Sequence, residues 1–102
     1  MGLTAVLENE SGEAIDRVED PTNILHRLLP SPDDARYRFL GTIDWYGDTV
    51  FNYLQASQFL EEWRRLTDQA QGSHETALVR AIEMMAERVA KERHLYLKFY
   101  GD

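Results

Sequence analysis

Hydrophobic and polar residues alternate at the start of the chain, which is the pattern of a β-strand with one buried face. Residues 3–8 place Leu3, Ala5 and Leu7 on the same side. The cluster Asn-Glu-Ser-Gly at residues 9–12 predicts a turn, and residues 13–18 then predict a return strand that buries Ile15. The sequence therefore predicts an N-terminal β-hairpin.

Two further segments show strand-like patterns. Residues 95–99, Leu-Tyr-Leu-Lys-Phe, alternate strictly, so that the apolar side chains point to one face and Tyr96, Lys98 and Tyr100 to the other. Residues 37–43 predict another strand with an irregularity at Gly41, and the short β-prone segment 49–51 follows it.

An apolar spacing of three or four residues predicts three helices. The first begins at Asp20-Pro21, an acidic N-cap followed by proline. The second follows Asn52, which has Gln55 three residues on and so fits a capping box. The third begins after Ser73, a second candidate cap. The predicted buried stripes are Ile24, Leu25, Leu28 and Leu29; then Ala56, Phe59, Leu60, Trp63, Leu66 and Ala70; then Leu78, Ala81, Ile82, Met85 and Val89.

The predicted elements follow one another as β-β-α-β-(β)-α-α-β. This order is typical of an α+β fold, here a mostly antiparallel sheet of four to five strands with three helices packed mainly on one face. A chain of 102 residues fits a single domain, residues 1–102. The other face of the sheet, with Tyr96, Lys98 and Tyr100, is predicted to stay partly open.

The negative charge is concentrated near the N-terminus. The formal net charge is -7, and residues 1–34 contain eight acidic and two basic residues, whereas residues 35–102 contain ten and nine. An acidic surface repels nucleic acid and anionic membranes and attracts basic proteins. The alternative interpretation is that the charge only keeps the chain soluble.

Several chemistries find little support in the sequence. There is no cysteine, no apolar run that would span a membrane and no secretory signal, so we expect a cytoplasmic protein. His26, His74 and His94 lie far apart and do not form a metal-binding motif. No glycine-rich phosphate loop or nucleophile motif is present, so we expect neither a cofactor nor catalytic residues.

The segment at residues 44–48, Asp-Trp-Tyr-Gly-Asp, is the most distinctive candidate site. Asp44 and Asp48 could bind a divalent cation or act as a general acid and base, or they could only hold the turn through backbone hydrogen bonds. Trp45 and Tyr46 lie between them, and strand alternation turns at least one of these rings outward. An exposed aromatic ring beside carboxylates is typical of a protein interface.

Residues 47–55, Gly-Asp-Thr-Val-Phe-Asn-Tyr-Leu-Gln, precede a helix that contains Leu-Glu-Glu-Trp at 60–63. This pattern, with the aromatic final strand that ends in Gly-Asp, resembles a group of small uncharacterised bacterial proteins, which implies no particular chemistry. The general plan of a small, acidic, cysteine-free domain is also similar to that of immunity proteins that neutralise toxins.

These observations favour a non-enzymatic protein-protein interaction domain, in its most specific version an immunity-like or antitoxin-like inhibitor of a basic toxin such as a nuclease. The alternatives are a small-ligand-binding protein or small hydrolase that uses Asp44 and Asp48 in a cleft with Tyr46 and Tyr96, and a structural subunit of a larger assembly. We expect a basic protein partner, neither nucleic acid nor membrane, and a monomer or homodimer. The predicted partner-binding residues are Glu8, Glu10, Glu13, Asp16, Asp44, Trp45, Tyr46 and Asp48.

Overall fold

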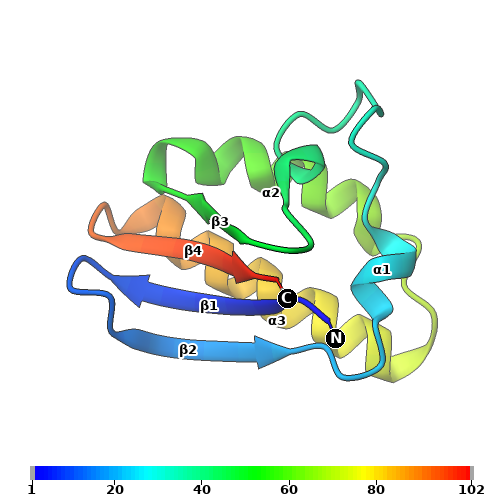
Figure 1. Cartoon of the computed structure of the whole chain (residues 1–102), viewed down its shortest axis with the longest axis horizontal. Coiled ribbons are helices and arrows are strands. Elements are labelled where there is room, and N and C mark those ends of the chain that lie inside the picture. Colours follow the sequence, from blue (N-terminus) through cyan, green and yellow to red (C-terminus); the bar gives the residue numbers. More distant parts are fainter. Residues whose placement is uncertain (1, 102) are drawn as a thin grey trace.

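The strands of the computed structural model, which describes residues 2–101, form one antiparallel sheet of four strands (Figure 1). Its order is β2-β1-β4-β3, so the first and last strands of the chain lie at the centre. The elements are β1 (Thr4–Asn9), β2 (Ala14–Glu19), α1 (Ile24–Leu28), η1 (Leu40–Thr42), β3 (Asp48–Phe51), α2 (Tyr53–Thr67), α3 (Gly72–Lys91) and β4 (Leu95–Tyr100). The predicted α+β class with three helices is therefore confirmed, and no fifth strand forms within residues 2–101.

The hydrophobic core lies between one face of the sheet and the long helices α2 and α3, which lie side by side behind the sheet in Figure 1. Successive side chains of a strand point to opposite faces of the sheet, so only every second strand residue enters this core. In β4, Leu95, Leu97 and Phe99 are buried, while the intervening side chains are only half-buried on the other face. Because no helix among residues 2–101 packs on that second face, the sheet has one helix-covered face and one open face, as predicted.

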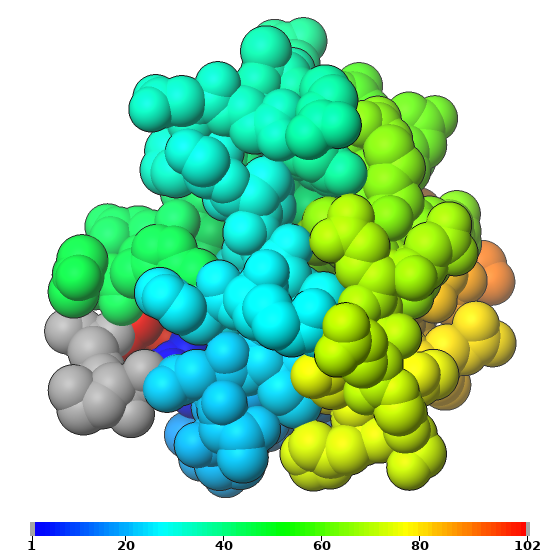
Figure 2. Space-filling model, turned by 90° about the vertical axis from the view of Figure 1, so that its right-hand side faces the viewer, coloured from blue at the N-terminus to red at the C-terminus, as the bar shows by residue number. Residues whose placement is uncertain are grey.

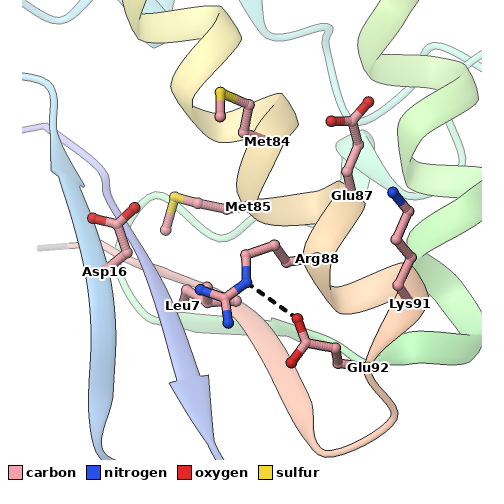
Figure 3. Close-up of a pocket in the computed structure, with 8 residues that line it drawn as sticks. All are labelled: Leu7, Asp16, Met84, Met85, Glu87, Arg88, Lys91 and Glu92. Atoms are coloured by element: carbon pink, nitrogen blue, oxygen red, sulfur yellow. Dashed lines mark hydrogen bonds and ion pairs between the residues drawn. The ribbon is translucent and has the colours of Figure 1, made fainter.

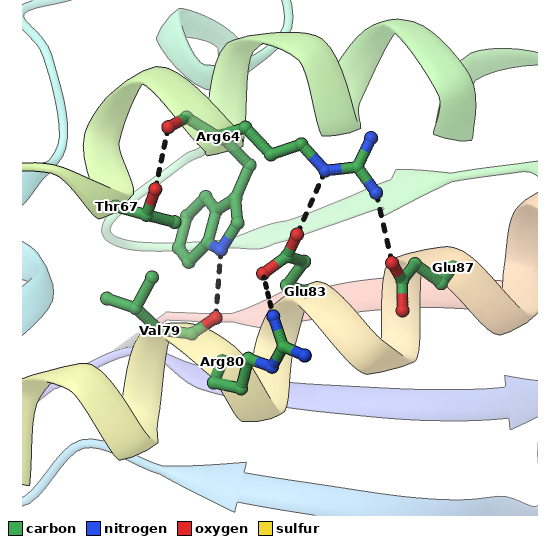
Figure 4. Close-up of polar contacts among 7 residues, drawn as sticks. Arg64, Thr67, Val79, Arg80, Glu83 and Glu87 are labelled. Carbon is green, nitrogen blue, oxygen red and sulfur yellow. Dashed lines mark hydrogen bonds and ion pairs between the residues drawn. The ribbon is translucent and has the colours of Figure 1, made fainter.

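Helices α2 and α3 contact each other through an aromatic side chain and a set of ion pairs (Figure 4). The Trp63 ring is fully buried and stacks on Phe59 with 5.5 Å between the ring centroids. Its Nε1 donates a hydrogen bond of 3.0 Å to the carbonyl oxygen of Val79 in α3. At the edge of the interface, Arg64 binds the carboxylates of Glu83 and Glu87 at 2.9 and 3.0 Å. The arginine side chain is thus directed at acids of α3.

The predicted strand at residues 37–43 is wrong. The segment is an irregular connection that ends in the short 3-10 helix η1. Its backbone N–H groups do not enter the sheet, since those of residues 38, 39 and 40 donate to the carboxylate of Glu62 at 3.0 to 3.2 Å. Its buried side chains, Tyr37, Leu40 and Ile43, recur at every third position, which is the period of 3-10 turns.

The prediction that Ile15 is buried is also wrong, although the hairpin itself forms. Leu7 pairs with Asp16 and Glu8 pairs with Ala14, which leaves Ile15 as the extra residue of a β-bulge. Its side chain is 44% exposed. The bulge therefore moves the residues of β2 by one position relative to simple alternation, and Val18 takes the half-buried place above the core.

Two helix starts follow the predicted chemistry, and a third does not. Asn52 caps α2 with the predicted capping box to Gln55. Helix α1 begins later than predicted, at Ile24, but the buried carboxylate of Asp20 accepts hydrogen bonds of 2.8 Å from the first two N–H groups of this helix. Helix α3 begins at Gly72, one residue before the predicted cap Ser73.

Candidate protein-binding surface

The loop of residues 44–47 leads directly into β3 at one end of the sheet. Asp48 pairs with Tyr100 of β4, and the N–H of Gly101 donates a 2.8 Å hydrogen bond to the carbonyl oxygen of Gly47. Tyr100 in turn pairs with Thr4. The loop therefore lies where β1 begins and β4 ends, beside the central strands.

Two hydrogen bonds link residues within this loop and at its end. The N–H of Asp44 donates to the Thr49 hydroxyl at 2.8 Å, and the Asp44 carboxylate accepts from the N–H of Tyr46 at 2.9 Å. The loop is also tightly packed, since a side chain at Gly47 would place its Cβ 2.7 Å from a carboxylate oxygen of Asp44. Asp44 thus supports the turn, as the simplest interpretation of the sequence predicts.

The two aromatic side chains of the loop point in different directions. Trp45 is half-buried, packs against the hydrophobic core and makes an edge-to-face contact with His26, with 5.3 Å between the ring centroids. Tyr46 is 84% exposed, more than the other large hydrophobic side chains of the described chain. Tyr46 is thus an exposed ring whose backbone N–H is bonded to the Asp44 carboxylate.

The acids of the hairpin do not form one exposed group. Glu8 is buried on the open face of the sheet, where Lys98 Nζ lies 2.8 Å from its carboxylate and the Tyr100 hydroxyl donates to it. Glu10 lies 3.0 Å from Nδ1 of His94. Glu13 and Asp16 are exposed and form no ion pair within residues 2–101. Glu8 is therefore not available to a partner, whereas Glu13 and Asp16 are.

The hairpin turn and the loop with Asp44 and Asp48 lie at opposite ends of the sheet, and Asp16 lies between them, where β2 pairs with Leu7. The hairpin turn follows Asn9, which pairs with Leu95, while Asp48 pairs with Tyr100 at the far end of β4. The length of a six-residue strand, about 17 Å, separates the two ends. The predicted partner-binding residues thus form two separate groups, and the loop of residues 44–48 is the one that contains both exposed acids and an exposed aromatic ring.

The structure does not bring Tyr96 together with Asp44 and Asp48, as the alternative hydrolase would need. Tyr96 pairs with Glu8 near the hairpin end of β4, so it lies away from Asp44 and Asp48. A hollow of about 460 Å³ on the open face is lined by other residues, among them Thr4, Val6 and Arg17. Within residues 2–101, no group of three or more His, Cys, Asp or Glu residues could hold a metal ion.

The contact among Glu8, Lys98 and Tyr100 joins the two central strands and was not foreseen from the sequence. Burial alone would raise the pKa of the Glu8 carboxyl, but hydrogen bonds from Lys98 and Tyr100 and the charge of the ammonium group outweigh it, so the pKa lies below its ordinary value of 4.5. The same pair raises the pKa of Lys98, chiefly through its hydrogen bond to Glu8. Each charge therefore stabilises the other.

Protonation of Glu8 is expected to destabilise the folded chain. Since its folded-state pKa is lowered, the ionised carboxylate contributes stability above pH 4.5, and this contribution is lost as the pH falls through the lower folded-state value. Urea unfolding at a series of pH values should show a smaller acid-induced loss in Glu8→Gln than in the unchanged chain. Equal losses in both proteins would show that the contacts of Glu8 with Lys98 and Tyr100 do not stabilise the folded chain.

Comparison of the chain with protein-family models, with curated proteins and with solved structures gave no match. None of the helices in residues 2–101 is both long enough and apolar enough to cross a lipid bilayer.

Proposed function

We propose that this chain is a non-enzymatic interaction domain that binds a basic protein, and that its most specific role is to inhibit a toxin such as a nuclease, in the way an immunity protein does. The observation that carries the proposal is the 84% exposure of Tyr46 on a loop held by hydrogen bonds. A tyrosine side chain has only two χ angles, so it loses little conformational entropy when it is buried in an interface.

The charges around Tyr46 support a basic partner. Asp44 and Asp48 are both exposed and form no ion pair with another described residue. The arginines of the helices are used elsewhere, because Arg64, Arg80 and Arg88 bind acids of α3 or of its C-terminal end. The two carboxylates are therefore free to attract a cationic surface and to speed its encounter with the loop.

A photo-reactive phenylalanine analogue at position 46 tests this proposal in the cells that express the chain. The Tyr46 side chain makes no hydrogen bond within the described structure, so the replacement leaves the fold intact. We expect irradiation to yield one dominant cross-linked product whose partner, identified by mass spectrometry, is a basic protein. The same analogue at Glu61, an exposed residue of α2, is the matched control.

Once the partner is identified, the second measurement is the rate at which it associates with a variant whose loop charge is reversed. Asp48→Lys is expected to slow association by about tenfold at low salt and to have less effect at high salt, because the attraction is screened. Glu61→Lys makes the same change of charge on a helix and should leave the rate nearly unchanged. The proposal fails if position 46 yields no product beyond that of position 61, or if the two charge reversals slow association equally.

A further inference from the structure

Strand β2 is an edge strand with an open side. It pairs with β1 along one side only, and within residues 2–101 no other strand lies beside it. Five of its six residues are exposed, and Val18 is half-buried. The unpaired N–H and C=O groups of such an edge are a template for another strand.

Two hollows lie between β2 and α3 on the helix-covered side of the sheet. At one end, a hollow of about 230 Å³ is lined by Val18, Pro21, Ile24, Ala77 and Ala81 among others, at the junction of the blue-to-cyan and yellow surfaces in Figure 2. Further along α3, a second hollow of about 230 Å³ is lined by Leu7, Asp16, Met84, Met85 and Arg88 among others, with both methionines above the strands in Figure 3. Apolar side chains thus line both hollows beside the open edge.

We infer that β2 pairs in antiparallel fashion with β2 of a second copy, so that two chains form a continuous eight-stranded sheet with a two-fold axis at Val18. In this arrangement the same surface of each copy meets itself, and the hollows lined by Val18 of the two copies lie near the axis. Val18, half-buried in the monomer, meets the same valine of the second copy.

The charges of β2 favour this register over those centred on a charged residue of the strand. An axis at Asp16, Arg17 or Glu19 would place identical charges directly opposite each other, which destabilises a strand pair. An axis at Val18 places Arg17 opposite Glu19 of the second copy, and does so twice by symmetry. It also places Asp16 opposite Asp20, whose carboxylate is buried and accepts hydrogen bonds from the first N–H groups of α1. Arg17 and Glu19 lie on the same open face of the sheet, since they pair with Val6 and Thr4 of β1. Both are exposed, and only 3.9 Å separates their charged atoms within one chain.

The second copy leaves the Tyr46 loop free. The loop precedes β3, which forms the opposite edge of the sheet from β2. The dimer therefore goes beyond the proposed function, and either can hold without the other.

Analytical ultracentrifugation of the purified chain at about 0.15 M salt, where repulsion between the two acidic copies is partly screened, tests the dimer directly. The expected result is a species of twice the chain mass of 11.9 kDa that dissociates on dilution. Arg17→Glu and Glu19→Arg should each raise the dissociation constant by about tenfold or more, since each places like charges opposite one another. Arg38→Glu changes the charge as Arg17→Glu does, at an exposed position outside the sheet, and should leave the constant unchanged.

Mixing the two weakened variants tests the proposed register. Arg17→Glu has glutamate at both 17 and 19, and Glu19→Arg has arginine at both positions. In the proposed register each glutamate of one variant lies opposite an arginine of the other. A mixed dimer should therefore form at least as tightly as the unchanged one. A variant that had merely lost its fold would not be rescued by mixing. A chain that remains at 11.9 kDa at every concentration, or a mixture that stays monomeric, would overturn the proposal.

Discussion

Trp63→Ala is expected to lower the free energy of unfolding by about 4 kcal/mol, a large part of the total stability of a domain of this size. The ring is fully buried between Phe59 and α3, and its removal leaves a cavity where the two long helices meet. It also removes the hydrogen bond from the indole N–H to the Val79 carbonyl oxygen. Urea denaturation followed by circular dichroism measures the change.

Leu54→Ala is the matched control for this substitution. Leu54 is a large apolar residue in the same helix, but its side chain is 67% exposed, so its truncation should change the free energy of unfolding by less than about 0.5 kcal/mol. If Trp63→Ala were as mild as Leu54→Ala, the contact between α2 and α3 would not depend on the tryptophan.

Glu62→Ala is expected to cost about 3 kcal/mol of the free energy of unfolding, because it leaves three backbone N–H groups without their acceptor. These groups lie in the connection between α1 and β3. We therefore expect this connection to open more readily, in addition to the loss of stability of the whole domain. Hydrogen exchange at residues 38–40 should speed up in the variant by more than exchange in β1 or β4.

Glu61, the residue next to Glu62, provides the control substitution. Glu61 is exposed and its carboxylate makes no hydrogen bond within residues 2–101, so Glu61→Ala should be nearly neutral. Glu62→Gln keeps one acceptor oxygen and should fall between the two alanine variants. Equal effects at positions 61 and 62 would mean that the carboxylate does not support the connection.

The sequence predicts the elements whose burial follows a simple period. Strict alternation in residues 95–99 gives β4, and the three-to-four spacing around Trp63 gives α2, each with the observed buried face. Asn52 and Gln55 also mark the start of α2 correctly, because a capping box depends only on residues close together in the sequence.

The errors arise where a residue far away in the sequence determines the local structure. Residues 37–43 contain enough apolar residues for a strand, but their N–H groups are bound by Glu62, which sequence alone places on the polar side of its helix. Ile15 was predicted to be buried because alternation from residue 13 onward cannot reveal an inserted bulge.

For the candidate surface, the sequence predicts which residues are exposed better than it predicts how they are arranged in space. The segment 44–48 does present an exposed aromatic ring between two exposed acids. The separation of this loop from the hairpin turn depends on strand order, and the burial of Glu8 depends on its pairing with β4. Neither can be read from local patterns, because β1 and β4 lie at opposite ends of the sequence.

The pairing of β1 with β4 also has a consequence for synthesis on the ribosome. Tyr100, the neighbour of Thr4 in the sheet, is added to the growing chain 96 residues after Thr4. Until then β1 has only β2 beside it, and a lone hairpin is at best marginally stable in water. The nascent chain therefore cannot complete its sheet until β4 has left the exit tunnel, and contacts so distant in sequence favour slow closure of the sheet.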